Sequence, residues 1–286
     1  MGGGSWTTAS YTCAINNMGF SNKTALASST VQNVYRMRAL ARDLDPKGVI
    51  RECRDTNEHP NTIPVILALD VTGSMGNAAK MCAAKLDDIM TELYKSVTDI
   101  EFLMMGIGDL AYDLAPIQAS QFESDIRILD QTTKIYFEAG GGGNSFESYT
   151  AAWYFGLNNT DLDCWKRGKK GIIITLGDEP LNPYLPGKAL SETLGTNTQD
   201  VDTKSLYDEV TEKFDVYHIA ITDHSSYRRY ENAINESWGK LLGQHFMTST
   251  SDKLPEVISS IVNDSINNYT VSDSSHVTVS DEGISW

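Results

Sequence analysis

Short apolar runs alternate with longer amphipathic segments through most of the chain. Residues 65–69, VILAL, form a continuous apolar run, which is expected for a central parallel strand covered on both faces. Residues 101–108, 171–176 and 216–222 repeat this pattern, and residues 75–97 carry apolar side chains at helical spacing. The alternation predicts an α/β fold: a doubly wound, mostly parallel, Rossmann-like sheet flanked by helices.

Four further segments predict helices around this sheet. They lie within residues 121–135 and at 146–157, 206–214 and 252–269. The last shows the clearest periodicity, and Pro255 suits a first helical turn.

The two ends of the chain differ from this repeating pattern. Residues 1 to about 25 are polar and rich in Gly, Ser and Thr, which predicts a segment that is loosely ordered or ordered only by docking. Residues 29–44 predict a helix, and residues 45–64 a turn-rich connector. The resulting division is an N-terminal extension with one helix (1–61), an α/β domain (62–270) and a polar tail or added edge strand (271–286).

Composition narrows the classes of function. The formal net charge of −15 argues against a nucleic-acid partner, because phosphate binding needs a basic surface. The four cysteines are scattered without a CxxC pair, which argues against zinc and fits a reducing compartment. No apolar run reaches the length of a membrane span, and the first residues lack the features of a signal peptide. These features predict an acidic cytoplasmic protein.

Oxygen-bearing side chains follow the first strand at alternate positions: Asp70, Thr72 and Ser74. Ligands of such sheets bind beyond the carboxyl ends of the strands. Oxygen ligands suit Mg²⁺, Mn²⁺ or Ca²⁺ rather than zinc or copper. The alternative is that Thr72 or Ser74 only caps the helix that follows.

Two later segments are expected at the same edge. The first contains four glycines, 140–143, before Asn144, Ser145, Phe146 and Glu147; its alternative is a flexible hinge, and it lacks the Gly-Lys-Ser/Thr ending of a nucleotide-binding loop. The second is Asp178-Glu179-Pro180, directly after the strand 171–176. Asp178 is expected to point toward Asp70, or else to serve as a turn or cap residue.

These three segments together resemble a von Willebrand factor A (vWA) domain with a metal-ion-dependent adhesion site (MIDAS). Residues 70–75 match the pattern D-x-T-G-S-M in full, and residues 177–180 match G-D-x-P. The middle segment resembles the GGG-D-x-P-E variant of hemicentin-like and alpha-kinase-associated vWA domains. Asn144 and Phe146 replace its aspartate and proline, while Glu147 is kept. The resemblance covers about residues 62–270.

The resemblance implies a divalent cation held by Asp70, Thr72, Ser74 and Asp178. It leaves the second-loop ligand open among Asn144, Ser145 and Glu147. Asp109 follows another strand and is either a supporting residue near the metal or a turn residue. The ion would keep one exchangeable position, which the carboxylate of a partner protein can fill.

The sequence therefore predicts a non-enzymatic, intracellular, magnesium-dependent module for protein–protein interaction. The alternatives are a regulatory subunit of an ATPase, a structural component of a larger assembly, and an enzyme. An enzyme would use the metal with Asp109, Glu147 or Glu179 as general base. Asp223 and His224 also follow a strand; they could contact a partner, although Asp223 is better explained as a helix cap.

Overall fold

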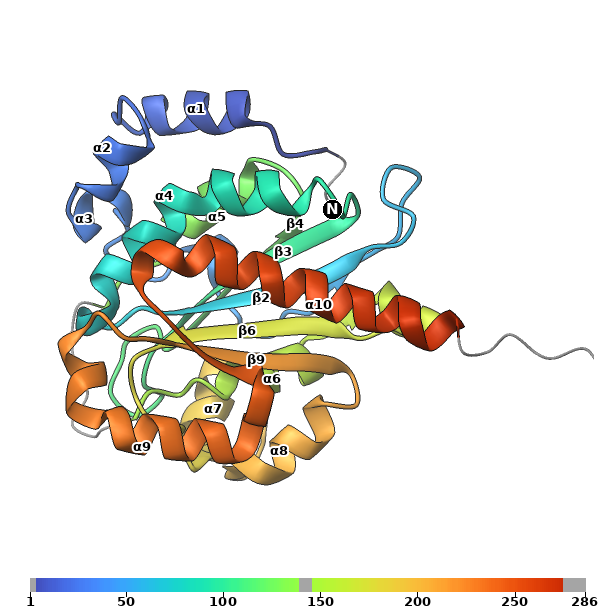
Figure 1. Ribbon diagram of the computed structural model, residues 1–286. Coiled ribbons are helices and arrows are strands. Elements are labelled where there is room, and N and C mark those ends of the chain that lie inside the picture. Colours follow the sequence, from blue (N-terminus) through green and yellow to red (C-terminus); the bar gives the residue numbers. More distant parts are fainter. Residues whose placement is uncertain (1–3, 139–145, 275–286) are drawn as a thin grey trace, which may run out of the picture.

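A six-stranded sheet forms the centre of the protein (Figure 1). The structure is a computed structural model that describes residues 4–138 and 146–274, with side chains described up to residue 267. The strand order is β10-β9-β6-β2-β3-β4, and only β4 runs antiparallel to its neighbour. The strands are β2 (Ile63–Asp70), β3 (Ile100–Ile107), β4 (Ile117–Glu123), β6 (Gly171–Gly177), β9 (Phe214–Ile221) and β10 (Phe246–Ser249). The predicted fold class is confirmed.

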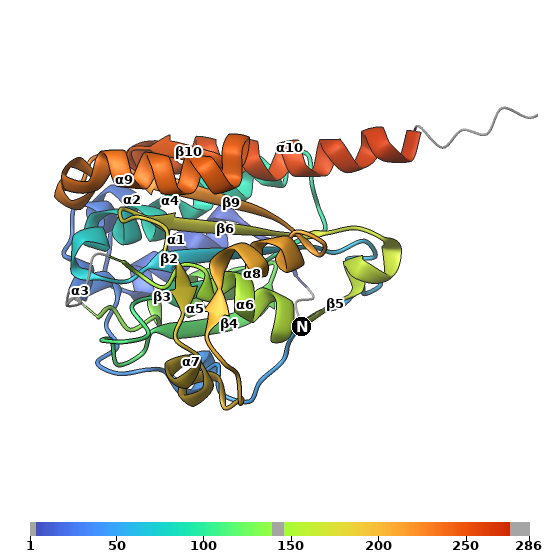
Figure 2. The same ribbon diagram turned by 90° about the horizontal axis from the view of Figure 1, so that it is seen from below.

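Helices cover both faces of this sheet and produce two hydrophobic cores (Figures 1 and 2). Side chains of β2 alternate between them: Val65 and Leu67 enter one core and Ile66 the other, because successive strand residues face opposite sides. The first core is covered by α4 (Gly76–Leu93), α5 (Arg127–Thr133) and α10 (Leu254–Ser274). The second is covered by α6 (Ala151–Asn158), α7 (Gly187–Leu194), α8 (Thr203–Val210) and α9 (Ser225–Leu242).

Smaller elements complete the described chain. Two short ribbons pair β1 (Arg51–Cys53) with β5 (Thr160–Leu162), and β7 (Tyr184–Leu185) with β8 (Val201–Asp202). The 3₁₀ turns are η1 (Arg42–Leu44), η2 (Gly73–Met75), η3 (Asp163–Arg167), η4 (Gly243–His245) and η5 (Ser251–Lys253). Among the described residues, no helix combines the length and apolar character needed to cross a membrane.

The order of the strands creates a topological switch point. Starting from the β4 edge, the strands come in the chain order 3-2-1-4-5-6. The direction of winding reverses between β2 and β6, which are direct neighbours. In sheets of this order a crevice opens at the carboxyl ends of the two strands where the winding reverses, and ligands bind there.

The N-terminal segment corrects the prediction of a single helix over residues 29–44. It contains α1 (Thr8–Asn17), α2 (Lys23–Ala27) and a four-residue α3 (Val31–Val34), after which the backbone is extended at Tyr35. The extended backbone at Tyr35 ends this helix, and the buried Tyr35 side chain instead donates a hydrogen bond to the Ala79 carbonyl of α4. The helix predicted within residues 121–135 is present as α5, whereas the helix predicted at 146–157 is shorter, since α6 begins at Ala151.

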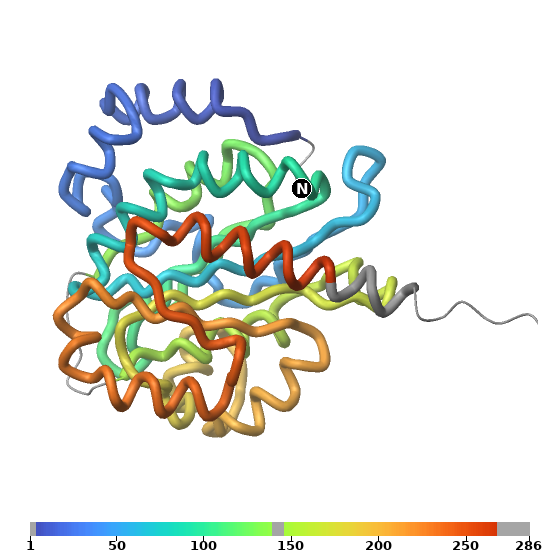
Figure 3. The backbone as a smooth tube through the Cα atoms, in the orientation of Figure 1, coloured from blue at the N-terminus to red at the C-terminus, as the bar shows by residue number. Residues whose placement is uncertain are grey.

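This segment lies along the outer side of α4 (Figure 3). Hydrogen bonds from three of its aromatic side chains attach it there. The Trp6 indole donates to Asp87 at 2.9 Å, and the Tyr11 hydroxyl donates to the Ala84 carbonyl at 2.8 Å. The Tyr35 hydroxyl donates to the Ala79 carbonyl at 2.7 Å. Docking orders this segment, which was one of the two predicted alternatives, and Leu26 joins the same core as the sheet.

Truncating Leu26 therefore tests whether the N-terminal segment stabilises the whole fold. We expect Leu26→Ala to lower the free energy of unfolding by about 2–5 kcal/mol, measured by urea denaturation, because it leaves a cavity in a shared core. Thr24→Ala, on the exposed side of the same helix, should change it by no more than about 0.5 kcal/mol. Equal stability of the two variants would contradict the shared core.

Candidate functional site

The predicted residues of the first and third loops meet at the switch point. β2 ends at Asp70 and β6 ends at Gly177, and the paired register of Leu69 with Leu176 puts these ends side by side. Asp70 and Asp178 therefore leave the sheet at the same edge, and both side chains are buried.

Asp70 organises the turn after β2. Its Oδ1 accepts hydrogen bonds from the Thr72 backbone N–H at 2.8 Å and from the Thr72 hydroxyl at 2.5 Å. Thr72 precedes η2, but its side chain makes no capping hydrogen bond. Helix capping, the alternative explanation for Thr72, is therefore not what this side chain does.

Ser74 joins the first loop to the third. Its hydroxyl donates to Asp178 Oδ1 at 3.0 Å. Thus Asp70, Thr72, Ser74 and Asp178 form two hydroxyl–carboxylate pairs at adjacent strand ends, and we call these four residues the candidate cation site. The second carboxylate oxygen of Asp178 has no hydrogen-bond partner and lies 3.5 Å from Nδ1 of His224.

Tyr149 is a residue of this site that the sequence analysis missed. Its hydroxyl donates to Asp70 Oδ2 at 2.7 Å, and its ring packs against His218 and Trp238. Gly177 allows this approach, because a Cβ there would lie 2.3 Å from the tyrosine ring. The only feature of the sequence that could have indicated Tyr149 was its position two residues after Glu147.

The predicted second loop is described only in part. Asn144 and Ser145 lie outside the described residues. Glu147 is buried, and its Oε2 has no hydrogen-bond partner. Its neighbour Phe146 is 37% exposed.

Asp109 lies in a tight turn after β3. Its Oδ1 accepts a hydrogen bond from the Ala111 N–H at 2.7 Å, as expected of a turn residue. Its buried Oδ2 has no hydrogen-bond partner. Asp109 is also close enough to contribute to the raised pKa values of Glu147 and Glu179, so it belongs to the electrostatic surroundings of the site.

The site concentrates negative charge in a buried place. Burial, and then repulsion by neighbouring carboxylates, raises the pKa values of Asp70 and Glu147 above their usual range and that of Glu179 to about 7. Among the described ion pairs, none brings a lysine or arginine to these groups; the basic neighbour is His224, beside Asp178. An uncompensated cluster of this kind is costly unless a cation joins it.

The donor set fits a hard divalent cation. Four described carboxylate oxygens in this cluster are buried without a hydrogen-bond partner: Asp109 Oδ2, Glu147 Oε2, Asp178 Oδ2 and Glu179 Oε2. Carboxylates and hydroxyls are the ligands that Mg²⁺, Mn²⁺ and Ca²⁺ prefer. No group of three or more His, Cys, Asp or Glu residues in the described part of the chain is arranged to hold a metal. The candidate cation site does not need one, because two of its four residues are hydroxyls.

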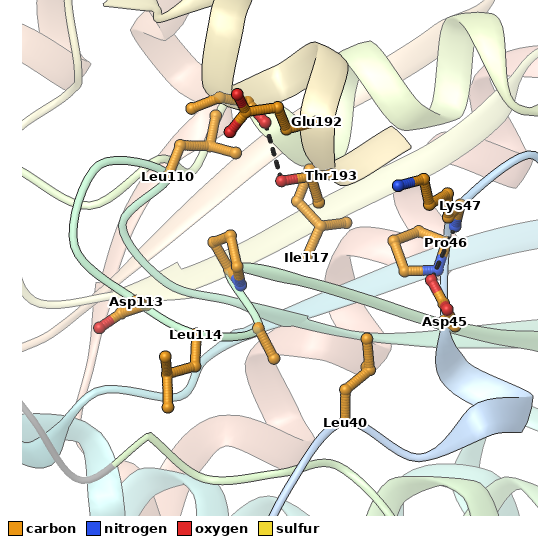
Figure 4. A pocket seen from close by; sticks show the side chains of 13 residues that line it. Leu40, Asp45, Pro46, Lys47, Leu110, Asp113, Leu114, Ile117, Glu192 and Thr193 are labelled. Atoms are coloured by element: carbon orange, nitrogen blue, oxygen red, sulfur yellow. Dashed lines mark hydrogen bonds between the residues drawn. The ribbon is translucent and has the colours of Figure 1, made fainter. Parts of the chain in front are cut away.

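A separate hollow of about 350 Å³ lies under the β3–β4 loop (Figure 4). Residues 40–47, the β3–β4 loop and α7 line it with both apolar and charged side chains. Leu114 at its rim is 85% exposed. None of the four residues of the candidate cation site lines this hollow, so it does not belong to that site.

Comparisons with known proteins leave the family open. No family model matches the sequence. No curated protein matches it either.

Several solved structures match the fold weakly. The pilus adhesin SpaC from Lactobacillus rhamnosus GG is 12% identical with a TM-score of 0.47; the match covers 78% of this chain but only 31% of SpaC. The conserved hypothetical protein BatB from Bacteroides thetaiotaomicron is 12% identical with a TM-score of 0.43, over 72% of this chain and 99% of BatB. The PilB minor pilin from Streptococcus sanguinis, as a D319A mutant, is 12% identical with a TM-score of 0.46, over 74% and 63%. Matches at this level do not transfer a function.

A substitution at Gly177 tests whether this glycine is needed to make room for the Tyr149 ring beside the candidate cation site. We expect Gly177→Ala to lower the free energy of unfolding by about 1–3 kcal/mol, because the added methyl group must displace the buried ring. Urea denaturation measures the change. Gly239→Ala within α9 is the matched control; its Cβ would meet its nearest neighbour at 3.8 Å, so stability should hold or rise. Equal stability of the two variants would show that the ring does not need this glycine.

Proposed function

We propose that this protein is a binding module that captures a protein partner through a divalent cation held by Asp70, Thr72, Ser74 and Asp178. The observation that carries this proposal is the buried carboxylate cluster at the switch point. One oxygen each of Asp178, Asp109, Glu147 and Glu179 lacks a hydrogen-bond partner, and no described lysine or arginine pairs with these carboxylates. The resemblance of the three loops to a MIDAS supports the same function.

The hydroxyl and carboxylate side chains of this site have different roles in the proposed binding of a cation. The hydroxyls of Thr72 and Ser74 are neutral, so they bind a cation without cancelling its charge. Asp70 and Asp178 accept hydrogen bonds from these hydroxyls and so fix their orientation. Tyr149 in turn fixes Asp70. A bound ion would supply positive charge and an exchangeable coordination position, which suits a carboxylate on a partner protein.

The burial of a nearby carboxylate favours a binding function over catalysis. Glu147 is buried, which limits its reach toward a substrate as a general base. Glu179 is better placed, so a metal-dependent hydrolase remains the contrasting hypothesis. Turnover of a phosphoester panel in Mg²⁺ that disappears in Glu179→Gln would favour that enzyme over the binding module.

Thermal unfolding with and without magnesium tests the cation. We expect Mg²⁺ to stabilise the wild type, by about 2.7 kcal/mol when its concentration is 100 times Kd. Asp178→Asn should lose this stabilisation. The same variant should be more stable than the wild type in EDTA, because it removes one buried charge from a repulsive cluster.

Asp208→Asn is the control for this experiment. Asp208 is an exposed carboxylate on α8, paired with Lys204, and its removal should leave the response to Mg²⁺ unchanged. The cation would be ruled out if the wild type showed the same unfolding temperature in Mg²⁺, Mn²⁺, Ca²⁺ and EDTA.

Affinity capture from the lysate of the native host tests the partner. Wild type in Mg²⁺, wild type in EDTA and Asp178→Asn in Mg²⁺ are compared by quantitative mass spectrometry. We expect at least one protein to be enriched about tenfold or more in the first condition alone. An ATPase in that set, with turnover that responds to this protein, would specify a regulatory subunit. Equal capture in all three conditions would contradict cation-dependent binding.

A further inference from the structure

An apolar pocket of about 470 Å³ lies beside the candidate cation site. Its walls are Phe146, Pro180 and Leu181 together with one face of α9, which contributes the apolar surface of Tyr230 and Ala233 and the polar residues Glu236, Ser237 and Lys240. The volume falls in the range of sites that hold a small ligand or a large side chain. The apolar part of its lining exceeds the polar part, unlike the hollow under the β3–β4 loop.

The pocket shares one loop with the candidate cation site and another with Glu147, a carboxylate of the cluster around that site. Phe146 directly precedes Glu147, and Pro180 and Leu181 follow Asp178 by two and three residues. The second of these loops is fastened to α9: the Leu181 N–H donates to the Ser237 hydroxyl and the Trp238 indole donates to the Glu179 carbonyl, both at 3.1 Å. A ligand that reaches the cation therefore finds a preformed apolar surface next to it.

The charge of α9 suits an acidic ligand. The helix carries three basic and two acidic residues in a chain whose net charge is −15. By helical spacing, Arg229 and Lys240 lie on the same face as Ala233, with Glu236 between them. Both basic side chains belong to exposed residues. This face is thus less repulsive to an acidic partner than most of the surface.

We propose that this pocket receives a large apolar side chain from the same acidic partner segment whose Asp or Glu binds the cation. The proposal rests on the proposed function above. It adds a second contact point that gives specificity, since a carboxylate alone is present on almost every protein. The partner motif therefore combines a carboxylate with a nearby Leu, Ile, Met or Phe, whose burial in the pocket strengthens binding.

A displayed peptide library tests both contact points together. The probe is a set of 12-residue peptides with one fixed central Asp and randomised flanks, selected on the full-length protein in Mg²⁺. We expect enrichment of large apolar residues at one flanking position, and loss of all enrichment in EDTA. For the best peptide, Ala233→Arg should weaken affinity about tenfold or more. Asn232→Arg, an exposed neighbour on a different face of α9, should leave it unchanged.

The outcomes separate this inference from the proposed function. Enrichment that depends on Asp and Mg²⁺ but shows no apolar preference, or is unaffected by Ala233→Arg, would overturn the pocket alone. Absence of any Asp- and Mg²⁺-dependent enrichment would overturn both. An apolar preference that persists in EDTA would show that the pocket and the cation act separately, against the proposal. A dimer of the unliganded protein that Ala233→Arg dissociates would place a second copy in the pocket instead.

Discussion

The site depends on one constraint: its carboxylates are buried, and no described lysine or arginine pairs with them. Asp70, Asp178 and Glu147 are all buried at the carboxyl edge of the sheet, and desolvation and repulsion by neighbouring carboxylates raise the pKa values of Asp70 and Glu147. Two hydrophobic cores hold β2 and β6 from both faces, so the strand ends cannot separate to relieve this repulsion. The packing of the sheet thereby stabilises a carboxylate cluster that would be unfavourable by itself.

The support around Asp70 shows how the position of one carboxylate is fixed. Its two oxygens accept hydrogen bonds from Thr72 and Tyr149. The tyrosine ring is held by Trp238, which itself stacks on His218 at 3.7 Å. An element far away in sequence, α9, thus contributes to the geometry of the loop after β2. Under the proposed function, this arrangement would hold the side chains of the candidate cation site in place before an ion binds, which would lower the entropic cost of binding.

The sequence predicted strands correctly where the buried apolar run is continuous. It was misleading where buried polar side chains make hydrogen bonds inside the protein. β2, β3, β6 and β9 were predicted because their apolar runs are uninterrupted. β4 was missed because Gln118 and Ser120 interrupt its pattern, yet both are buried through hydrogen bonds to the backbone of Tyr136 and Met104.

α9 and the residues around the site also show where local sequence patterns were informative and where they were not. α9 was missed because only Tyr227, Ile234, Trp238 and Leu242 of its 18 residues are buried. The spacing of Asp70, Thr72, Ser74 and Asp178 at the ends of β2 and β6 predicted that these side chains would lie at one edge of the sheet, and they do. Their role in binding a cation stays a prediction. Tyr149 and His224 depend on tertiary packing, which no local pattern records. The division of the chain at residue 61 and the role of Asn144 and Ser145 stay predictions.

The attachment of the first helices to α4 has a consequence for biosynthesis. Trp6, Tyr11 and Tyr35 find their hydrogen-bond partners 81, 73 and 44 residues later in the chain. During translation these helices leave the ribosome before the surface that receives them exists, and short isolated helices are marginal in water. This segment is synthesised before α4, so its apolar side chains stay exposed and accessible to chaperones until α4 has been made.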